Sequence, residues 1–171
     1  MSRIRRSLTD HAAKTMAVAL VLSRLDYCNA LLGEVGKGQV ERLQRVQNSA
    51  ARVISGTRKR DHIKPVLRDL HWLPICDRIK HKLLSITYQC KKKIGPEYLS
   101  ELVPDYQPVR VLRSASKQLL SVPPKKEINT VTYGERSFKY LGPKLWNDIP
   151  QNLKNSASKE SFKRNLKTFL F

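Results

Sequence analysis

The amino-acid sequence predicts a mainly α-helical protein: a helical bundle over residues 1–104, followed by a small α+β region over residues 105–171 with a short β-ribbon. Three observations support this fold class. Apolar residues recur at three- and four-residue steps through most of the first part, which is the period of an amphipathic helix. Glycines and prolines separate these periodic segments. After Asp105 prolines become frequent, and two short stretches have a strand-like composition.

The composition favours a folded protein that binds a polyanion. The chain has 171 residues, of which 40% are hydrophobic, so it is long enough to bury a core. It contains 33 Lys and Arg against 14 Asp and Glu, which gives a net charge of +19. This excess points first to nucleic acid and second to an anionic membrane surface. The basic residues are spread along the chain, so we expect them on the outer faces of folded helices.

The amino-terminal part predicts a long helix that ends in a glycine-containing turn. This helix, capped by Thr9 or Ser7, is expected to run to about Leu32. Its unbroken apolar run Met16–Leu22 is too short to span a bilayer, and we expect it to be buried in the bundle and not in a membrane. The loop at 33–38 lacks the spacing of a phosphate-binding loop, so we interpret it as a helix-to-helix turn.

Further helices are expected on both sides of an apolar corner at 72–74. One helix should run from Val40 to Ile54 and end at Gly56. A short helix, about His62 to Leu70, follows a basic turn. Because Pro74 lacks a backbone donor and fixes its φ angle, a new helix should begin near it. One stripe of that helix carries the apolar residues Ile75, Ile79, Leu83, Ile86 and Cys90, and the opposite side carries Arg78, Lys82, Gln89 and Lys92.

The carboxy-terminal part predicts shorter elements. A short helix is expected at Glu97–Val103, and Gln118–Val122 and Asn129–Tyr133 are expected to pair as a hairpin or an edge ribbon. A final helix capped by Ser158 should turn its apolar residues Phe162, Leu166 and Phe169 inward. Aromatic and basic residues alternate between Tyr133 and Trp146; such aromatics either stack on nucleic-acid bases or form the core of a small domain.

The basic helix faces and turns are the candidate nucleic-acid-binding site. Because each expected helix buries its opposite face, contacts to phosphate cost no core packing, and we expect weak sequence preference. A solvated surface is the alternative interpretation of the same pattern. The candidate residues are Arg42, Arg45, Arg52, Arg58, Lys59, Arg60, Arg78, Lys82, Lys91, Lys92 and Lys93.

The sequence contains no motif that predicts catalysis. There is no HExxH motif, no Gly-x-Ser-x-Gly motif and no pair of adjacent aspartates suited to two magnesium ions, so we expect no catalytic residue, metal or cofactor. A zinc site from His71, Cys76, His81 and Cys90 is disfavoured because His81 should point away from the stripe that carries the two cysteines. Three cysteines, an odd number without short pairing, indicate a reducing compartment, either the nucleus or the cytoplasm.

Seven segments in order along the chain resemble one family, the jockey-like LINE (non-LTR) retrotransposon reverse transcriptases, in the region that follows their palm subdomain. The segments are SRLDYCNALL (23–32), LQRVQNSAARVI (43–54), LHWLPICDRI (70–79), YLSELV (98–103), YGERSF (133–138), LWNDIP (145–150) and FKRNLKTFLF (162–171).

The resemblance implies a thumb-like bundle and tail that hold template RNA and primer strand. The family's polymerase aspartates and its endonuclease lie upstream of the matched region, so it implies no catalytic residue here. RNA and DNA are the implied partners, together with the palm region of a reverse transcriptase. The resemblance describes a truncated part of an RNA-directed DNA polymerase. The alternatives are a protein-interaction module, whose apolar helical stripes bind a partner chain, and an inert relic of a retroelement reading frame.

Overall fold

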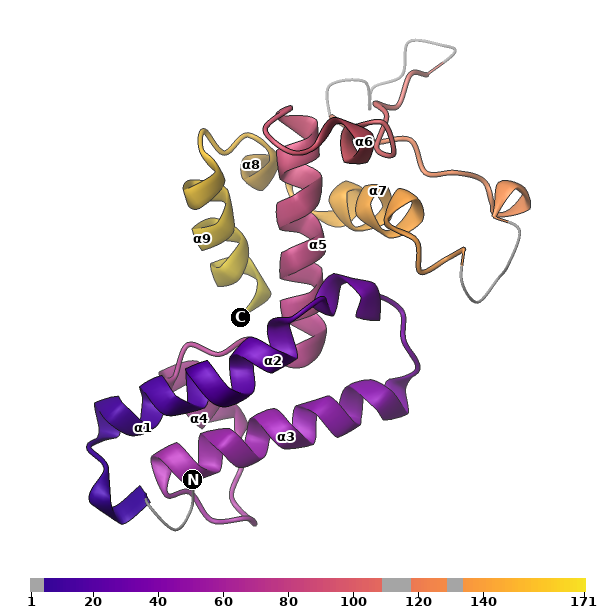
Figure 1. The fold of residues 1–171 in the computed structure, drawn as a ribbon. Coiled ribbons are helices and arrows are strands. Elements are labelled where there is room, and N and C mark those ends of the chain that lie inside the picture. Colours follow the sequence, from indigo (N-terminus) through magenta and orange to yellow (C-terminus); the bar gives the residue numbers. More distant parts are fainter. Residues whose placement is uncertain (1–4, 109–117, 129–133) are drawn as a thin grey trace. The chain divides into compact units, whose positions relative to one another are not determined.

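The computed structural model describes residues 5–108, 118–128 and 134–171 (Figure 1). Within these residues the protein is mainly helical, as predicted, and has no β-strand. The described chain forms two compact units: the first holds residues 5–29, 35–78 and 171, and the second holds residues 30–34, 79–108, 118–128 and 134–170. The units divide after Arg78, inside a helix, and therefore not at the boundary of 104 that the sequence suggested.

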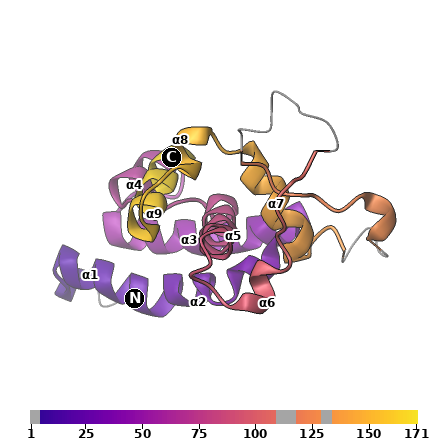
Figure 2. The same cartoon turned by 90° about the horizontal axis from the view of Figure 1, so that it is seen from above.

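The first unit contains two antiparallel helical segments that lie side by side (Figures 1 and 2). Its core consists of Ala17, Leu22, Ala50, Ala51, Ile54, Leu67 and Trp72. Its elements are η1 (Arg5–Ser7), α1 (Asp10–Ala17), η2 (Val18–Leu22), α2 (Ser23–Asp26), α3 (Lys37–Ser55), α4 (Lys64–Asp69) and the first turn of α5 (Ile75–Lys91).

The π-helical turn η2 decides which residues of the first helical segment face the core. Ala13 and Ala17 are fully buried, and the next buried residue is Leu22, because a π turn inserts an additional residue into the helical repeat. Val18 and Leu20 are turned outward and are 44% and 54% exposed. The expectation that the whole run Met16–Leu22 is buried is therefore wrong.

The two ends of this segment are set by local hydrogen bonds. Thr9 caps α1, since its Oγ1 accepts a hydrogen bond from the Ala12 amide at 3.2 Å. The segment ends at Asp26, whereas the sequence predicted that the helix would run to about Leu32. Cys28 has a φ of 51°, in the left-handed region, which interrupts the helix before the separate 3₁₀ turn η3 (Asn29–Leu32).

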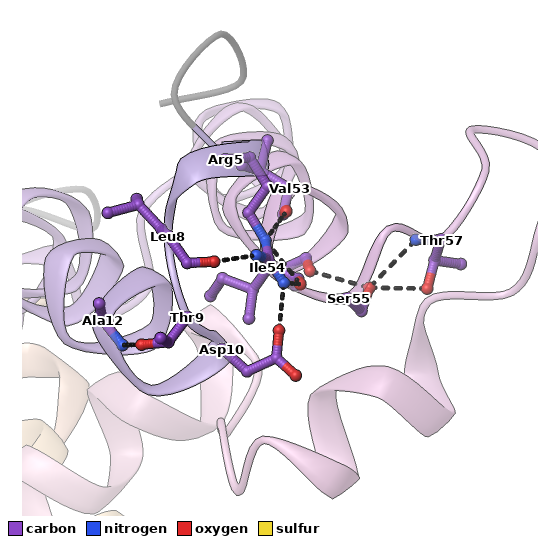
Figure 3. A network of polar contacts seen from close by, with 10 residues as sticks. Arg5, Leu8, Thr9, Asp10, Ala12, Val53, Ile54, Ser55 and Thr57 are labelled. Carbon is purple, nitrogen blue, oxygen red and sulfur yellow. Dashed lines mark hydrogen bonds and ion pairs between the residues drawn. The ribbon is translucent and has the colours of Figure 1, made fainter.

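Arg5 joins the beginning of α1 to the end of α3 (Figure 3). Its guanidinium donates to the carbonyls of Val53 at 3.2 Å, Ile54 at 2.9 Å and Leu8 at 3.0 Å, and it forms an ion pair with Asp10. The last carbonyls of a helix have no partner within the helix, so a cation that donates to them is doubly favourable there. After α3, Gly56 adopts a φ of 70° and ends the helix, as predicted.

Two glutamines of α3 hold the corner that precedes α5. Gln47 is fully buried, and its Nε2 donates to the Leu73 carbonyl at 2.8 Å. Gln44 Nε2 donates to Gln47 Oε1 at 2.9 Å, and Gln44 Oε1 accepts from the Ile75 amide at 2.9 Å. The glutamines therefore satisfy backbone groups at a corner where Pro74 cannot donate, and α5 begins at Ile75 as predicted.

The second unit packs shorter helices against the remainder of α5. Its further elements are α6 (Glu97–Ser100), η5 (Lys125–Glu127), α7 (Phe138–Asp148), α8 (Gln151–Lys154) and α9 (Lys159–Leu170). Tyr88 stacks on Phe162 with ring centroids 4.4 Å apart, and Trp146 lies 6.1 Å from Phe162. These rings come from α5, α9 and α7, so residues before and after 104 share one core. This shared core is the reason that the compact units do not divide there.

Helix α7 was not predicted from the sequence, and Gly142 and Pro143 lie inside it. Gly142 has a packing role: a Cβ atom at this position would lie 3.0 Å from Thr87 Oγ1 of α5, so glycine allows the two helices to approach closely. At the end of the chain, Ser158 caps α9 through the Ser161 amide, as predicted. Phe169 was expected to point inward but is 52% exposed.

The predicted β-ribbon is not formed in the described residues. Of its two expected strands, Asn129–Tyr133 lies outside these residues, and Gln118–Val122 makes only an isolated antiparallel bridge between Leu120 and Asp105. The side chain of Asn147, on α7, bonds to both backbone groups of Leu120, at 2.9 Å and 3.0 Å. The backbone N–H and C=O of Leu120, which a further strand would need for pairing, are therefore already bound to a helix.

Candidate nucleic-acid interface

Arg42 and Arg45 project from the solvent side of α3. They are three residues apart, so they are neighbours on the helix surface, and both are exposed. The opposite side of the helix is buried through Gln47, Ala51 and Ile54. Within the described residues neither arginine makes an ion pair, so both guanidinium groups are available to an anion.

Arg52, on the same helix, has a structural role. Its Nε donates to the Arg58 carbonyl at 3.3 Å and its terminal amino group donates to the Asp61 carbonyl at 3.2 Å. Asp61 closes the same turn, because its carboxylate accepts from the Arg58 amide at 3.1 Å. The side chain of Arg52 therefore supports the turn and is less available to phosphate than those of Arg42 and Arg45.

The supported turn presents three consecutive cations. Arg58, Lys59 and Arg60 are all exposed, and Lys64, at the start of α4, is exposed as well. Asp61 is the one acidic side chain between them, and it is bonded to the backbone of the turn. Three cations on a turn held at both ends form a local concentration of positive charge, which is suited to a phosphate backbone.

Arg78 is engaged with another side chain. Its Nε donates to Asp26 Oδ1 at 2.8 Å, and a terminal amino group pairs with Oδ2 of the same carboxylate. The Arg78 side chain is only 17% exposed. Such a fork-shaped pair fixes both groups, so Arg78 holds the end of α2 and has little free charge for a ligand.

The lysines of the second unit differ from one another in availability. Lys91 forms an ion pair with Asp105, and its side chain is 20% exposed. Lys92 lies over the Tyr88 ring, with its Nζ 5.9 Å from the centroid, and is exposed. Lys93 is exposed and follows the helix with a φ of 54°. Lys82 is exposed too but lies about 15 Å along α5 from Lys92, at a rise of ~1.5 Å per residue.

The candidate residues thus fall into an available group and an engaged group. The available group in the first unit is Arg42, Arg45, Arg58, Lys59 and Arg60, and in the second unit it is Lys82, Lys92 and Lys93. The engaged group is Arg52, Arg78 and Lys91. The sequence prediction omitted Lys64, although its place just after the basic turn was a visible signal.

The groups with catalytic or metal-binding chemistry do not assemble in the described residues. No cluster of three or more His, Cys, Asp or Glu residues suited to a metal ion lies within them. Cys76 is exposed and Cys90 is buried, so the two do not lie on one stripe as the sequence suggested. Burial raises the pKa of the Cys90 thiol, which keeps it protonated and disfavours it as a ligand or nucleophile. His81 bonds through Nε2 to the Lys163 carbonyl at 3.1 Å.

None of the helices in the described residues has the length and apolar character needed to cross a membrane. Comparison of the chain with protein-family models, with curated proteins and with solved structures gives no match.

Proposed function

We propose that this protein is a nucleic-acid-binding region of a retroelement reverse transcriptase, the part that follows the palm, and that it holds template and primer without performing polymerisation. Its partners are RNA, DNA and the palm region, and it acts inside the cell, in the nucleus or the cytoplasm. The ordered resemblance to jockey-like non-LTR elements supports the family. The observation that carries the binding function is the exposed turn Arg58–Arg60, supported by Arg52 in a chain of net charge +19.

The five available cations of the first unit set the expected salt dependence. If Arg42, Arg45 and the three cations of the turn 58–60 each neutralise one phosphate of duplex DNA, the logarithm of affinity falls with the logarithm of salt concentration at a slope of about −4.5. The slope on single-stranded RNA or DNA is shallower, about −3.5. Because these contacts reach phosphate and not base edges, sequences of equal length should bind with similar affinity.

Two variants with the same loss of charge test which cations make contact. Arg42→Gln combined with Arg45→Gln removes two available cations and should make the slope on duplex DNA less steep by about 1.8. Arg78→Gln combined with Lys91→Gln removes two ion-paired cations and should leave the slope nearly unchanged. The measurement is fluorescence anisotropy of labelled oligonucleotides over a salt series, with helicity checked by circular dichroism.

Two results would overturn the proposal. One is the absence of RNA and DNA binding at low salt; the other is an equal change of slope for the two double variants, which would mean that only net charge matters. A separate assay addresses polymerisation. We expect the purified chain with magnesium and a primed template to incorporate no nucleotide, and template-dependent incorporation would refute the non-catalytic role.

A further inference from the structure

The first unit leaves apolar side chains uncovered where η2 meets α3. Val18 on η2 is 44% exposed, and Val46 on α3 is 49% exposed. Val46 lines an open hollow of about 380 Å³, together with Val21, Arg45, Ser49, Ala50 and Val53. Single exposed apolar residues are common on protein surfaces, whereas a group around a hollow is typical of an interaction site.

A second hollow continues the apolar surface along the first helical segment. It measures about 470 Å³ and is lined by His11, Lys14, Thr15, Val18 and Ala19. Val18 lies three residues before Val21 of the first hollow, so these two side chains are neighbours on the helix surface and connect the two hollows.

The surroundings of both hollows are cationic. Lys14 lines one hollow and Arg45 lines the other, and no acidic residue lines either. The exposed Arg42 lies four residues, or one helical turn, from Val46. The ligand that complements this surface has an apolar face bordered by negative charge.

We propose that this surface binds an acidic amphipathic helix of another protein. The stretch of α3 that lines the hollow, Val46 to Val53, covers about two turns, so a partner helix with apolar residues at three- and four-residue steps can follow it. The space between two packed helical segments accepts the side-chain ridge of a third helix. A second copy of this chain is a poor occupant, because each copy carries a net charge of +19.

The test uses a labelled synthetic peptide of about 18 residues, five helical turns, with leucines along one face and glutamates elsewhere. A scrambled peptide has the same composition and charge but no apolar face. Anisotropy is measured at a salt concentration of about 0.3 M, which screens non-specific attraction. We expect the amphipathic peptide to bind about tenfold more tightly than the scrambled one, since only the former buries Val18 and Val46.

A pair of matched variants locates the site. Val18→Ser with Val46→Ser should weaken binding of the amphipathic peptide about tenfold, because each of these residues lines one hollow. The control is Ile94→Ser with Tyr98→Ser, which alters residues that are 62% and 66% exposed on the second unit and should have no effect. Neither pair changes the net charge, so both variants should still bind nucleic acid. Nucleic-acid binding is measured separately and tests the proposed function, whereas peptide binding tests this surface.

Three outcomes would overturn the inference: equal affinity for the two peptides, equal affinity of the wild type and the Val18 and Val46 variant, or binding to anionic phospholipid vesicles but not to the amphipathic peptide. The last result would identify the surface as one that contacts lipid. If the variant loses helicity, the comparison of the two peptides on the wild-type chain decides the question.

Discussion

Replacing Gln47 with leucine is expected to destabilise the first unit by about 1–3 kcal/mol. Gln47 is fully buried and donates to the Leu73 carbonyl at 2.8 Å. Leucine fills a similar volume, so the cost of a cavity is small, but it leaves a buried carbonyl without its donor. Gln44 Nε2 retains its bond to Asn48 Oδ1 at 2.8 Å, so the orphaned carbonyl is the main loss. The stated range is the usual cost of one such group.

Urea unfolding monitored by Trp72 fluorescence measures this effect, in a Trp146→Phe background that leaves Trp72 as the only tryptophan. With a slope of about 2 kcal/mol per molar urea, the midpoint should fall by about 0.5–1.5 M. Gln39→Leu is the matched control: it makes the same chemical change at an exposed position of α3 and should alter stability by less than about 0.5 kcal/mol. An unchanged or higher midpoint for Gln47→Leu would refute the claim that this bond supports the corner.

Three further predictions follow from local contacts. Arg5→Ala should lower the stability of the first unit by about 1–3 kcal/mol, because three carbonyls lose a donor; Arg6→Ala, at an exposed neighbouring position, should have little effect in the same urea assay. Gly56→Ala should cost about 1–2 kcal/mol, because φ is 70° there and no atom lies near the added Cβ to compensate. Gly38→Ala, inside α3 with equally open space, should instead stabilise by about 0.5 kcal/mol, and equal effects of the two alanines would contradict the backbone explanation. Burial raises the pKa of the Cys90 thiol, so the unfolded chain loses this proton at lower pH than the folded protein does. The associated stability is present below the ordinary thiol pKa of about 8.5 and is lost as the pH rises above it, so unfolding midpoints measured between pH ~7 and ~10 should fall less in Cys90→Ala than in the wild type.

The helices that begin and end at strong local signals were predictable from the sequence. Thr9, Gly56 and Ser158 mark helix ends through their own side chain or φ angle, and these assignments are confirmed. The long helix after Pro74 was also predictable, since its apolar stripe and its start are encoded within about one turn of the chain. The basic character of the candidate interface is likewise a property of composition alone.

The errors occur where a contact distant in sequence replaces the local preference. The π turn moves the inward position from Val21 to Leu22, and no periodicity analysis with a fixed helical step anticipates that shift. Gln118–Val122 has strand-like residues, but Asn147 binds the backbone N–H and C=O of Leu120, so these groups are not available to a further strand. Phe169 fits the helical period as well as Leu170 does, and packing places Leu170 against the core.

The sequence by itself determined where α3, α5 and α9 lie, because their apolar periods and end signals depend on residues within one or two turns of each other. It also determined the strong positive charge of the protein, which is a property of composition. Only the tertiary structure decided which charges are free. Arg42 and Arg78 look alike in the helical pattern, yet Arg42 faces solvent and Arg78 is bound by Asp26, which lies 52 residues away in sequence. The availability of a charge depends on its partner in space, and partners distant along the chain leave no periodic signal in the sequence.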